Sequence, residues 1–370
     1  MHCDTRLLFF LSYLTFLIAH DTDEQSYHSF IEFHRGGDLT KLILASPHGG
    51  FLGSNQLTGK YGQSTMMNTA SSLLLPLPIG GCYNITLDRC VYNLQECLRA
   101  NIEDTEKPSF QPDARCMLDR SSTSAMYSLT KSIAETFSIR YRPYTILNRL
   151  TRHYVDPAED LTLGTFLFES ATRVYMDYHR LIAMSKEAIR SESSGLFIEF
   201  TFHQDSETIQ LGYGFDVSRT SLFWKQNHTT IWDLLSRSGS NIVRDNRSLS
   251  YFLHKNGFEH VIPLDHQYRH RHHQQSQLPS YPVHYRTSTH STRAHADTHF
   301  NAILFSYPIE RLRTHSIKLE ASRITKAIEQ FMVTNRIQLR SSSLSLSFNS
   351  VLFIYSFFIL LFSASLLNDD

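Results

Sequence analysis

Histidine can bind a metal or move a proton near neutral pH, and two places in this sequence concentrate that chemistry. His48 follows an apolar run, LILAS at residues 42–46, and the two glycines after it would let a ligand approach the backbone closely. Taken alone, His48 also fits a histidine that is merely hydrogen-bonded in a turn. Residues 265–299 include HQYRHRHHQQ. Such a tract can bind metal, but its irregular spacing and few apolar residues favour a solvated loop.

Four of the five cysteines form a cluster within 35 residues: Cys82, Cys90, Cys97 and Cys116. An even number in a secreted chain predicts two disulfides, and three connectivities are possible. The spacings of 7, 6 and 18 intervening residues fit no common zinc site. N-glycosylation sequons begin at Asn84, Asn227 and Asn246, which also favours a secreted chain.

Both ends of the sequence carry signals that address a chain to a membrane. Residues 7–19 are uncharged and apolar, and acidic residues follow them, so we expect a signal peptide over residues 1–19. Residues 351–367 are strongly apolar and predict a membrane anchor over residues 341–370. Either a glycolipid attached near residues 341–343 or a transmembrane helix would serve. We favour the glycolipid, because arginines precede the apolar segment and no basic residue follows it. The protein is therefore expected at the cell surface.

Composition excludes several classes of protein. The chain has 35 Lys+Arg and 35 Asp+Glu, so its charge gives no reason to bind nucleic acid. A hydrophobic fraction of 41% and a charged fraction of 19% exclude a disordered chain and a polytopic membrane protein. The length of 370 residues allows two domains or one large one.

Apolar periodicity predicts the elements that must position any site. Strands are expected at residues 42–46, 142–147, 195–202, 209–215 and 300–305, and helices at 121–137, 161–189, 248–255 and 320–333. Strands separated by helices predict an α/β fold: one large three-layer domain over residues 20–340, whose mostly parallel or mixed sheet carries helices on both faces. The polar residues from about 54 to 116 indicate a disulfide-bearing insertion.

Several stretches, in order, resemble the N-formylglutamate amidohydrolase-like proteins, particularly their extracellular animal-type members. They are FIEFHRGGDLTKLILASPHGG (30–50), MLDRSSTSAMYSLTKSIAETF (117–137), RYRPYTILNRLTRHYVD (140–156), GLFIEFTFHQDSETIQLGYGF (195–215) and FNAILFSYPIERLR (300–313). The resemblance covers roughly residues 30–331. It implies a zinc-peptidase-like α/β fold and one zinc-activated water that cleaves an amide bond, since a metal lowers the pKa of bound water to about 7.

The resemblance also implies roles for individual residues. His48 matches the family's first metal-binding histidine. Asp119 and Glu199 match its catalytic carboxylates, although helix capping explains Asp119 equally well. Arg149 and Arg152 match a basic pair that would hold a substrate carboxylate, and surface ion pairing explains them equally well. The family also has counterparts of Asp156 and His179, which we interpret as structural here.

The chain departs from the family's pattern at the ends of two strands. Thr201 stands where the family has a metal-binding histidine, and Ser306 stands where it has a glutamate. His203 is the remaining candidate for a second metal ligand. It shares a strand face with Thr201 but would lie about 7 Å further along the strand.

Three functions remain open, and the third of them is a purely structural glycoprotein, which would need no pocket. The first is a membrane-anchored extracellular protein with degraded catalysis that acts in binding or adhesion. The second is an active zinc-dependent amidohydrolase that cleaves a C–N amide bond of a small carboxylate-bearing substrate. In it, His203 and His179, or histidines of the tract at residues 265–300, would complete a rearranged site with His48. Zinc is expected if the chain is active. The membrane is the expected partner, a small-molecule or protein ligand is not identified, and no nucleic acid is expected.

Overall fold

The computed structural model describes residues 30–52, 74–93, 95–97, 112–189, 194–204, 206–214, 229–239, 241–263 and 287–337. The expected signal peptide, the apolar segment at residues 351–367, the sequon at Asn227 and most of the His-rich tract lie outside these residues. Within the described residues, no helix is both long and apolar enough to cross a membrane.

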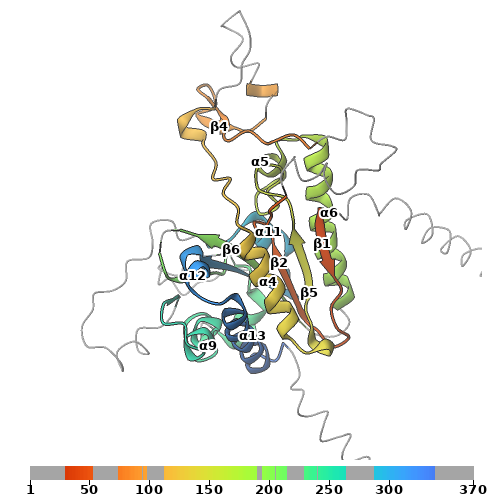
Figure 1. The fold of residues 1–370 in the computed structure, drawn as a ribbon, viewed down its shortest axis with the longest axis vertical. Coiled ribbons are helices and arrows are strands. Elements are labelled where there is room, and N and C mark those ends of the chain that lie inside the picture. Colours follow the sequence, from red (N-terminus) through yellow and green to blue (C-terminus); the bar gives the residue numbers. More distant parts are fainter. Residues whose placement is uncertain are drawn as a thin grey trace, which may run out of the picture.

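A seven-stranded mixed sheet with the order β1-β5-β2-β6-β9-β7-β8 forms the centre of the molecule (Figure 1). The strands β5, β2, β6 and β9 run parallel, β1 and β7 run antiparallel to their inner neighbours, and β8 runs parallel to β7. The bounds are β1 Ile31–His34, β2 Leu42–Ser46, β5 Tyr144–Asn148, β6 Gly195–His203, β7 Ile209–Gly212, β8 Val261–Ile262 and β9 Phe300–Pro308.

Helices cover both faces of this sheet. Successive side chains of its central strands point to opposite faces, and both sets are apolar. Leu42 and Leu44 of β2 belong to a core that includes α4 (Ser124–Thr136), α7 (Trp232–Ser238), α9 (Leu249–Lys255) and α13 (Ile317–Thr334). Ile43 and Ala45 belong to the opposite core, which α6 (Glu169–Ile189) covers together with α11 (His290–His295). Short helices α5 (Leu161–Thr165), α8 (Asn241–Arg244) and α12 (Ile309–Thr314) complete the α/β fold. The predicted three-layer α/β class is confirmed.

One predicted helix is divided in the structure. The pattern over residues 161–189 predicts a continuous helix, but α5 ends at Thr165 and α6 begins at Glu169. Phe166 and Leu167 lie between them with φ of 50° and 60°, a left-handed conformation that ends a helix. Phe166 is buried against Leu77 and Ala171, so packing against a separate part of the chain sets the break.

A small disulfide lobe, residues 74–93, 95–97 and 112–118, lies beyond one end of the sheet, where Figure 1 labels β4. Its two antiparallel strands are β3 (Cys82–Asn84) and β4 (Arg89–Val91), and the 3-10 helix η2 (Ala114–Cys116) follows. The structure contains two disulfides, Cys82–Cys97 and Cys90–Cys116, each with a Cα–Cα distance of 5.6 Å. This agrees with the expected number and selects one of the three connectivities.

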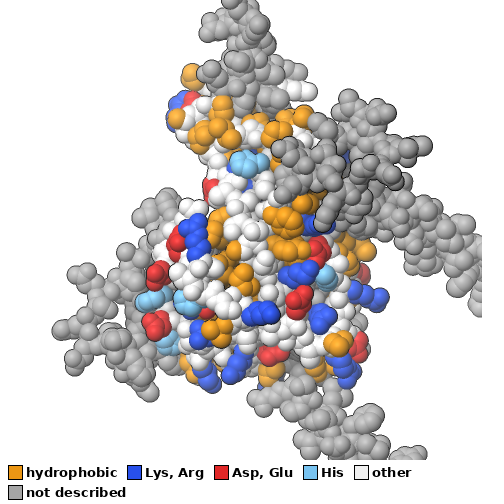
Figure 2. Space-filling view, in the orientation of Figure 1, with side chains coloured by type: hydrophobic (Ala, Val, Ile, Leu, Met, Phe, Trp, Pro, Cys, Tyr) orange, Lys and Arg blue, Asp and Glu red, His pale blue; other side chains and the backbone are white. Residues whose placement is uncertain are grey.

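Exposed apolar side chains gather on the disulfide lobe (Figure 2): Leu75, Ile79, Ile85, Leu87 and Met117 are each at least half exposed. The sequon asparagine Asn84 lies beside them at the end of β3, and its Oδ1 accepts a hydrogen bond from the Leu87 amide at 3.0 Å. The sequon asparagine Asn246 is exposed on the main domain. Asn246 is therefore open to solvent, and Asn84 is partly so.

Candidate functional site

The candidate site lies at the edge of the sheet where the parallel strands β2, β5 and β6 end, the edge at which open α/β sheets bind ligands. His48 follows β2, and Arg152 and Asp156 lie in the loop after β5. Gly50 lets these two connections approach, because a Cβ there would lie 1.7 Å from the carbonyl oxygen of Leu150. Parallel strand order thus brings together residues that are about a hundred positions apart in the sequence.

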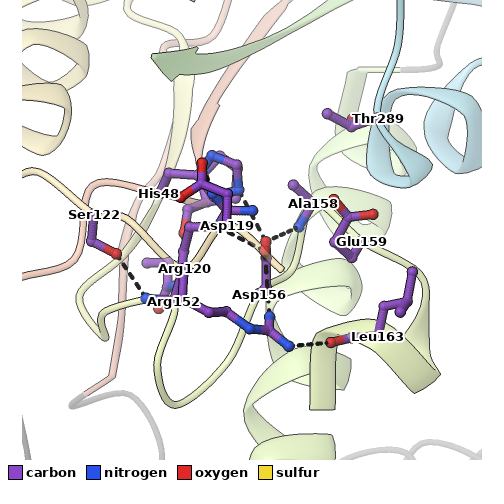
Figure 3. A network of polar contacts seen from close by, with 12 residues as sticks. His48, Asp119, Arg120, Ser122, Arg152, Asp156, Ala158, Glu159, Leu163 and Thr289 are labelled. Carbon is purple, nitrogen blue, oxygen red and sulfur yellow. Dashed lines mark hydrogen bonds and ion pairs between the residues drawn. The ribbon is translucent and has the colours of Figure 1, made fainter. Parts of the chain in front are cut away.

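The carboxylate of Asp156 is the centre of a buried polar network (Figure 3). Its Oδ1 lies 2.9 Å from His48 Nε2 and accepts a hydrogen bond from the Ala158 amide at 3.2 Å. Its Oδ2 accepts a hydrogen bond from Arg152 Nε at 2.7 Å and lies 3.6 Å from Arg120 Nη1. The side chains of Asp156, His48, Arg152 and Arg120 are all at least nine-tenths buried.

The charge on Asp156 is stabilised by these partners. Burial by itself would raise the pKa of this carboxyl, because a low dielectric disfavours the charged form. The nearby Arg152 and His48, and then Arg120, outweigh burial and hold the pKa of Asp156 well below its ordinary value. The carboxylate is therefore ionised at neutral pH and compensates the two buried guanidinium groups.

Asp119 forms the outer end of the same network. Its Oδ2 accepts a hydrogen bond from Arg152 Nη1 at 3.2 Å, and its Oδ1 accepts one from the Ser121 amide at 2.8 Å. The Asp119 side chain is 73% exposed. Burial alone would raise the pKa of Asp119, but the hydrogen bonds from Ser121 and the charge of Arg152 lower it below the usual value. Of this network, the Asp119 carboxylate is the part that solvent reaches most easily.

Glu199 lies on the sheet face that α6 and α11 cover. It is fully buried in β6, and its Oε1 accepts a hydrogen bond of 2.6 Å from the hydroxyl of Thr289, the N-cap residue of α11. Further along the strand pair, Thr201 of β6 faces Ser306 of β9, and both are buried. The structure therefore places Glu199 against α11, and it places Thr201 and Ser306 side by side.

Two other candidates lie apart from this network. His203 Nε2 hydrogen-bonds the carbonyl oxygen of Thr208, 2.9 Å away in the connection between β6 and β7. The guanidinium of Arg149 lies 5.9 Å from the ring centre of Phe51, and the Arg149 amide donates to the carbonyl of Phe30. His48 and His203 thus make separate local contacts.

The described residues do not supply the donors of a zinc site. No group of three or more His, Cys, Asp or Glu side chains in the described part of the chain is placed to hold a metal ion. Zinc in proteins generally needs three or four such ligands. The side chain of His48 is directed at a carboxylate held by two arginines, and a threonine and a serine stand at the neighbouring strand ends. These residues do not fit the zinc that the sequence resemblance implies.

Sequence reasoning gave Asp156 a minor role and did not single out Arg120 or His295. Arg152 and Asp156 form an ion pair, and their spacing of four residues was the one signal of it in the sequence. His295 of α11 and His179 of α6 form a second buried cluster, in which His179 Nδ1 lies 2.8 Å from His295 Nε2. These two histidines are 116 residues apart, so no local pattern connects them.

Burial controls the protonation of this histidine pair. It lowers the pKa of His179 to about 4, with a smaller contribution from the nearby His290. Burial also lowers the pKa of His295 to about 3, assisted by His179 and Lys186. Lys186 Nζ donates to the His295 carbonyl at 2.6 Å and to Asp297 at 2.8 Å. Both imidazoles are therefore neutral at neutral pH.

No model of a known protein family matches the sequence, and no curated protein matches it. Solved structures with a similar chain path include an N-formylglutamate amidohydrolase from Ralstonia eutropha JMP134. Its sequence is 10% identical, and the TM-score is 0.39. The alignment covers 83% of this chain and 98% of the Ralstonia chain. A gene product of Agrobacterium tumefaciens has 9% identity, 84% and 98% coverage and a TM-score of 0.38. A Shewanella denitrificans protein described as a metallopeptidase has 10% identity, 82% and 78% coverage and a TM-score of 0.28. Similarity at this level assigns no activity to the chain.

Proposed function

We propose that this chain is a membrane-anchored, extracellular relative of the N-formylglutamate amidohydrolase-like proteins that has lost hydrolysis and acts by binding a ligand. The observation that carries the proposal is the pair of uncharged side chains, Thr201 and Ser306, at the ends of β6 and β9. The sequence motifs place a metal-binding histidine and a glutamate of the family at these two positions.

The chemistry of the two side chains supports loss of catalysis. A threonine hydroxyl is a poor substitute for an imidazole as a zinc ligand. A serine hydroxyl does not accept a proton from water near neutral pH as a glutamate carboxylate does. Both residues are buried side by side in a continuous strand pair, so the fold tolerates these changes without a local break.

One observation favours the alternative, an active zinc-dependent amidohydrolase. The imidazole of His48 is held by the carboxylate of Asp156, and metal-binding histidines often use one ring nitrogen in this way while the other binds the ion. The same contact also serves a purely structural histidine, because His48 lies in a network that balances two buried arginines. Metal content and activity decide between the two functions.

We expect the purified full-length protein to retain well under one zinc per chain after dialysis against zinc and then buffer. We also expect no hydrolysis of N-formyl-L-glutamate above the buffer rate. Elemental analysis and detection of released formate are the measurements. The matched variants are His48→Ala and His260→Ala, since His260 is exposed and outside the network. One tightly held zinc that is lost in His48→Ala and kept in His260→Ala would contradict the loss of catalysis.

The membrane anchor is the second part of the proposal. The apolar residues 351–367 and the small residues at 341–343 support a glycolipid anchor. Phosphatidylinositol-specific phospholipase C is expected to release the protein from intact expressing cells. Retention on the cells, with the last residues of the sequence still present in the mature chain by mass spectrometry, would instead indicate a transmembrane helix.

A further inference from the structure

The hairpin turn of the disulfide lobe exposes two large apolar side chains. Strands β3 and β4 pair with Asn84 opposite Arg89, so residues 85–88 form the turn between them. Ile85 is 84% exposed and Leu87 is 53% exposed. Turns are usually built from Gly, Pro, Asn, Asp and Ser, which need no apolar contact. Apolar side chains that gather at a surface commonly mark a face that another molecule covers.

Polar contacts hold this turn in one shape. The Oδ1 of Asn84 accepts a hydrogen bond from the Leu87 amide at 3.0 Å. The hydroxyl of Tyr83 donates to the carboxylate of Asp88, whose φ of 47° lies in the left-handed region. The guanidinium of Arg115 lies over the Tyr83 ring, 3.6 Å from its centre. The two apolar side chains are therefore presented by a turn whose shape does not depend on them.

The same turn contains a glycosylation sequon, Asn84-Ile85-Thr86. Thr86 is exposed and Asn84 is partly exposed. The hydrogen bond to the Leu87 amide uses the oxygen of the Asn84 side chain. It leaves the amide nitrogen, the atom that carries an N-linked glycan, out of this contact. The sequon and the exposed apolar side chains thus share one turn, whereas the sequon at Asn246 lies between two charged residues.

We propose that Asn84 carries an N-linked glycan whose first sugars lie over Ile85 and Leu87. This inference rests on the proposed extracellular location, because the donor of the glycan, a lipid-linked oligosaccharide diphosphate, belongs to the secretory pathway. In the transfer, Nδ2 of Asn84 loses a proton and bonds to the anomeric carbon of the first sugar. The bond from that carbon to the diphosphate breaks, and the lipid diphosphate leaves.

The chemistry of a sugar suits this position. One face of a pyranose ring carries mostly C–H groups, so a sugar attached at Asn84 shields the neighbouring apolar side chains from water and still presents its hydroxyls to solvent. A glycan is also bulky and solubilising. A glycan on Asn84 therefore removes an apolar face that would otherwise favour association with other proteins.

The position of the turn disfavours the other possible occupants. The lobe and α13 lie at opposite ends of the molecule (Figure 1). Since α13 ends at Thr334 and the expected anchor begins at residue 341, the turn lies away from the membrane that holds the chain. A second copy docked on the turn would have the sequon asparagine within the contact, because Asn84 directly precedes Ile85.

The test uses the full-length protein on intact cultured animal cells. Glycosidase treatment in heavy-oxygen water marks each glycosylated asparagine, and mass spectrometry then reads the occupancy of Asn84. Hydroxyl-radical labelling of the same cells measures how accessible Ile85 and Leu87 are. We expect an occupied Asn84, and we expect labelling of both apolar side chains to rise severalfold when the glycan is removed enzymatically before labelling. Leu319 of α13, which is 48% exposed, is the internal reference and is expected to keep its labelling rate.

Variants repeat the comparison without the enzyme. Thr86→Ala removes the sequon and keeps Asn84 with its hydrogen bond to the Leu87 amide, so labelling of Leu87 is expected to rise as it does after enzymatic removal. Thr86→Ser keeps the sequon and is expected to label like the wild type. Asn246→Gln removes the other described sequon and is also expected to leave the labelling of Leu87 unchanged. Equal labelling of Leu87 in the wild type and Thr86→Ala would mean that the glycan does not cover the turn, and it overturns the inference.

Two further outcomes separate this inference from the proposed function. A bare Asn84 together with a glycan at Asn227 or Asn246 overturns the inference and leaves the extracellular location standing. A protein that carries no glycan at any of its three sequons and is absent from the cell surface contradicts the extracellular location itself, and the inference falls with it.

Discussion

Replacing Asp156 with alanine is expected to lower the free energy of unfolding by about 3 to 5 kcal/mol, the range found when one partner of a buried ion pair is removed. The substitution leaves the guanidinium groups of Arg152 and Arg120 buried without their carboxylate. It also removes the acceptor of His48. Urea unfolding at pH 7, followed by circular dichroism and tryptophan fluorescence, measures the change.

Asp38→Ala is the matched control for that experiment. The Asp38 carboxylate also forms an ion pair with an arginine, Arg140, at 3.3 Å, but its side chain is 65% exposed. Exposed pairs contribute little, so we expect a loss below about 1 kcal/mol. Equal losses for Asp156→Ala and Asp38→Ala would mean that the buried network does not stabilise the fold as described.

Mild acid is expected to destabilise the protein through the buried pair of His179 and His295. Both folded-state pKa values, about 4 and about 3, lie below the ordinary histidine value of 6.5. Between pH 6.5 and pH 4.5 the unfolded chain therefore binds protons that the folded chain does not, and stability falls as the pH falls. Each histidine contributes about 1.4 kcal/mol per pH unit, or on the order of 2 to 3 kcal/mol over this window.

The acid effect can be assigned to these two residues by substitution. The window lies above the usual carboxylate range, so aspartates such as Asp297 beside Lys186 contribute little to it. The double variant His179→Gln, His295→Gln keeps hydrogen-bonding groups that do not titrate, and we expect its stability to change much less between pH 6.5 and pH 4.5. His260→Gln, at an exposed position, is expected to keep the wild-type slope. A double variant with the wild-type slope would exclude the pair as the cause.

The buried network around Asp156 has a consequence for the shape of the site. The network around Asp156 joins the ends of β2 and β5 to the segment before α4, so it maintains the edge of the sheet whether or not catalysis persists.

The amino-acid sequence by itself determined the elements whose signals are local. The apolar runs of β2, β6 and β9 and the helical spacing of α4 predict strands and a helix close to those observed, and the alternation of strands and helices predicts the α/β class. The even number of clustered cysteines predicts two disulfides. These predictions succeed because periodicity and cysteine count depend on short stretches of chain.

Tertiary structure decided what depends on contacts between distant segments. The interruption between α5 and α6 follows from the packing of Phe166 against the disulfide lobe, which no pattern within residues 161–189 reveals. The pairing of β3 with β4 places Cys82 and Cys90 on opposite faces of the hairpin, so each bonds a cysteine of a later segment. Element boundaries and cysteine partners of this kind are set by the segment that packs against them.

The site itself was decided in the same way. Asp156 is the centre of its network because the parallel order of β2 and β5 brings its loop against His48, 108 residues earlier in the chain. Thr201 lies beside Ser306 because of the register of β6 and β9, and His179 meets His295 because α6 and α11 cover the same face. Burial and charge act on a side chain through whatever surrounds it in space, so the protonation and partners of these residues follow from the fold and not from their neighbours in the sequence.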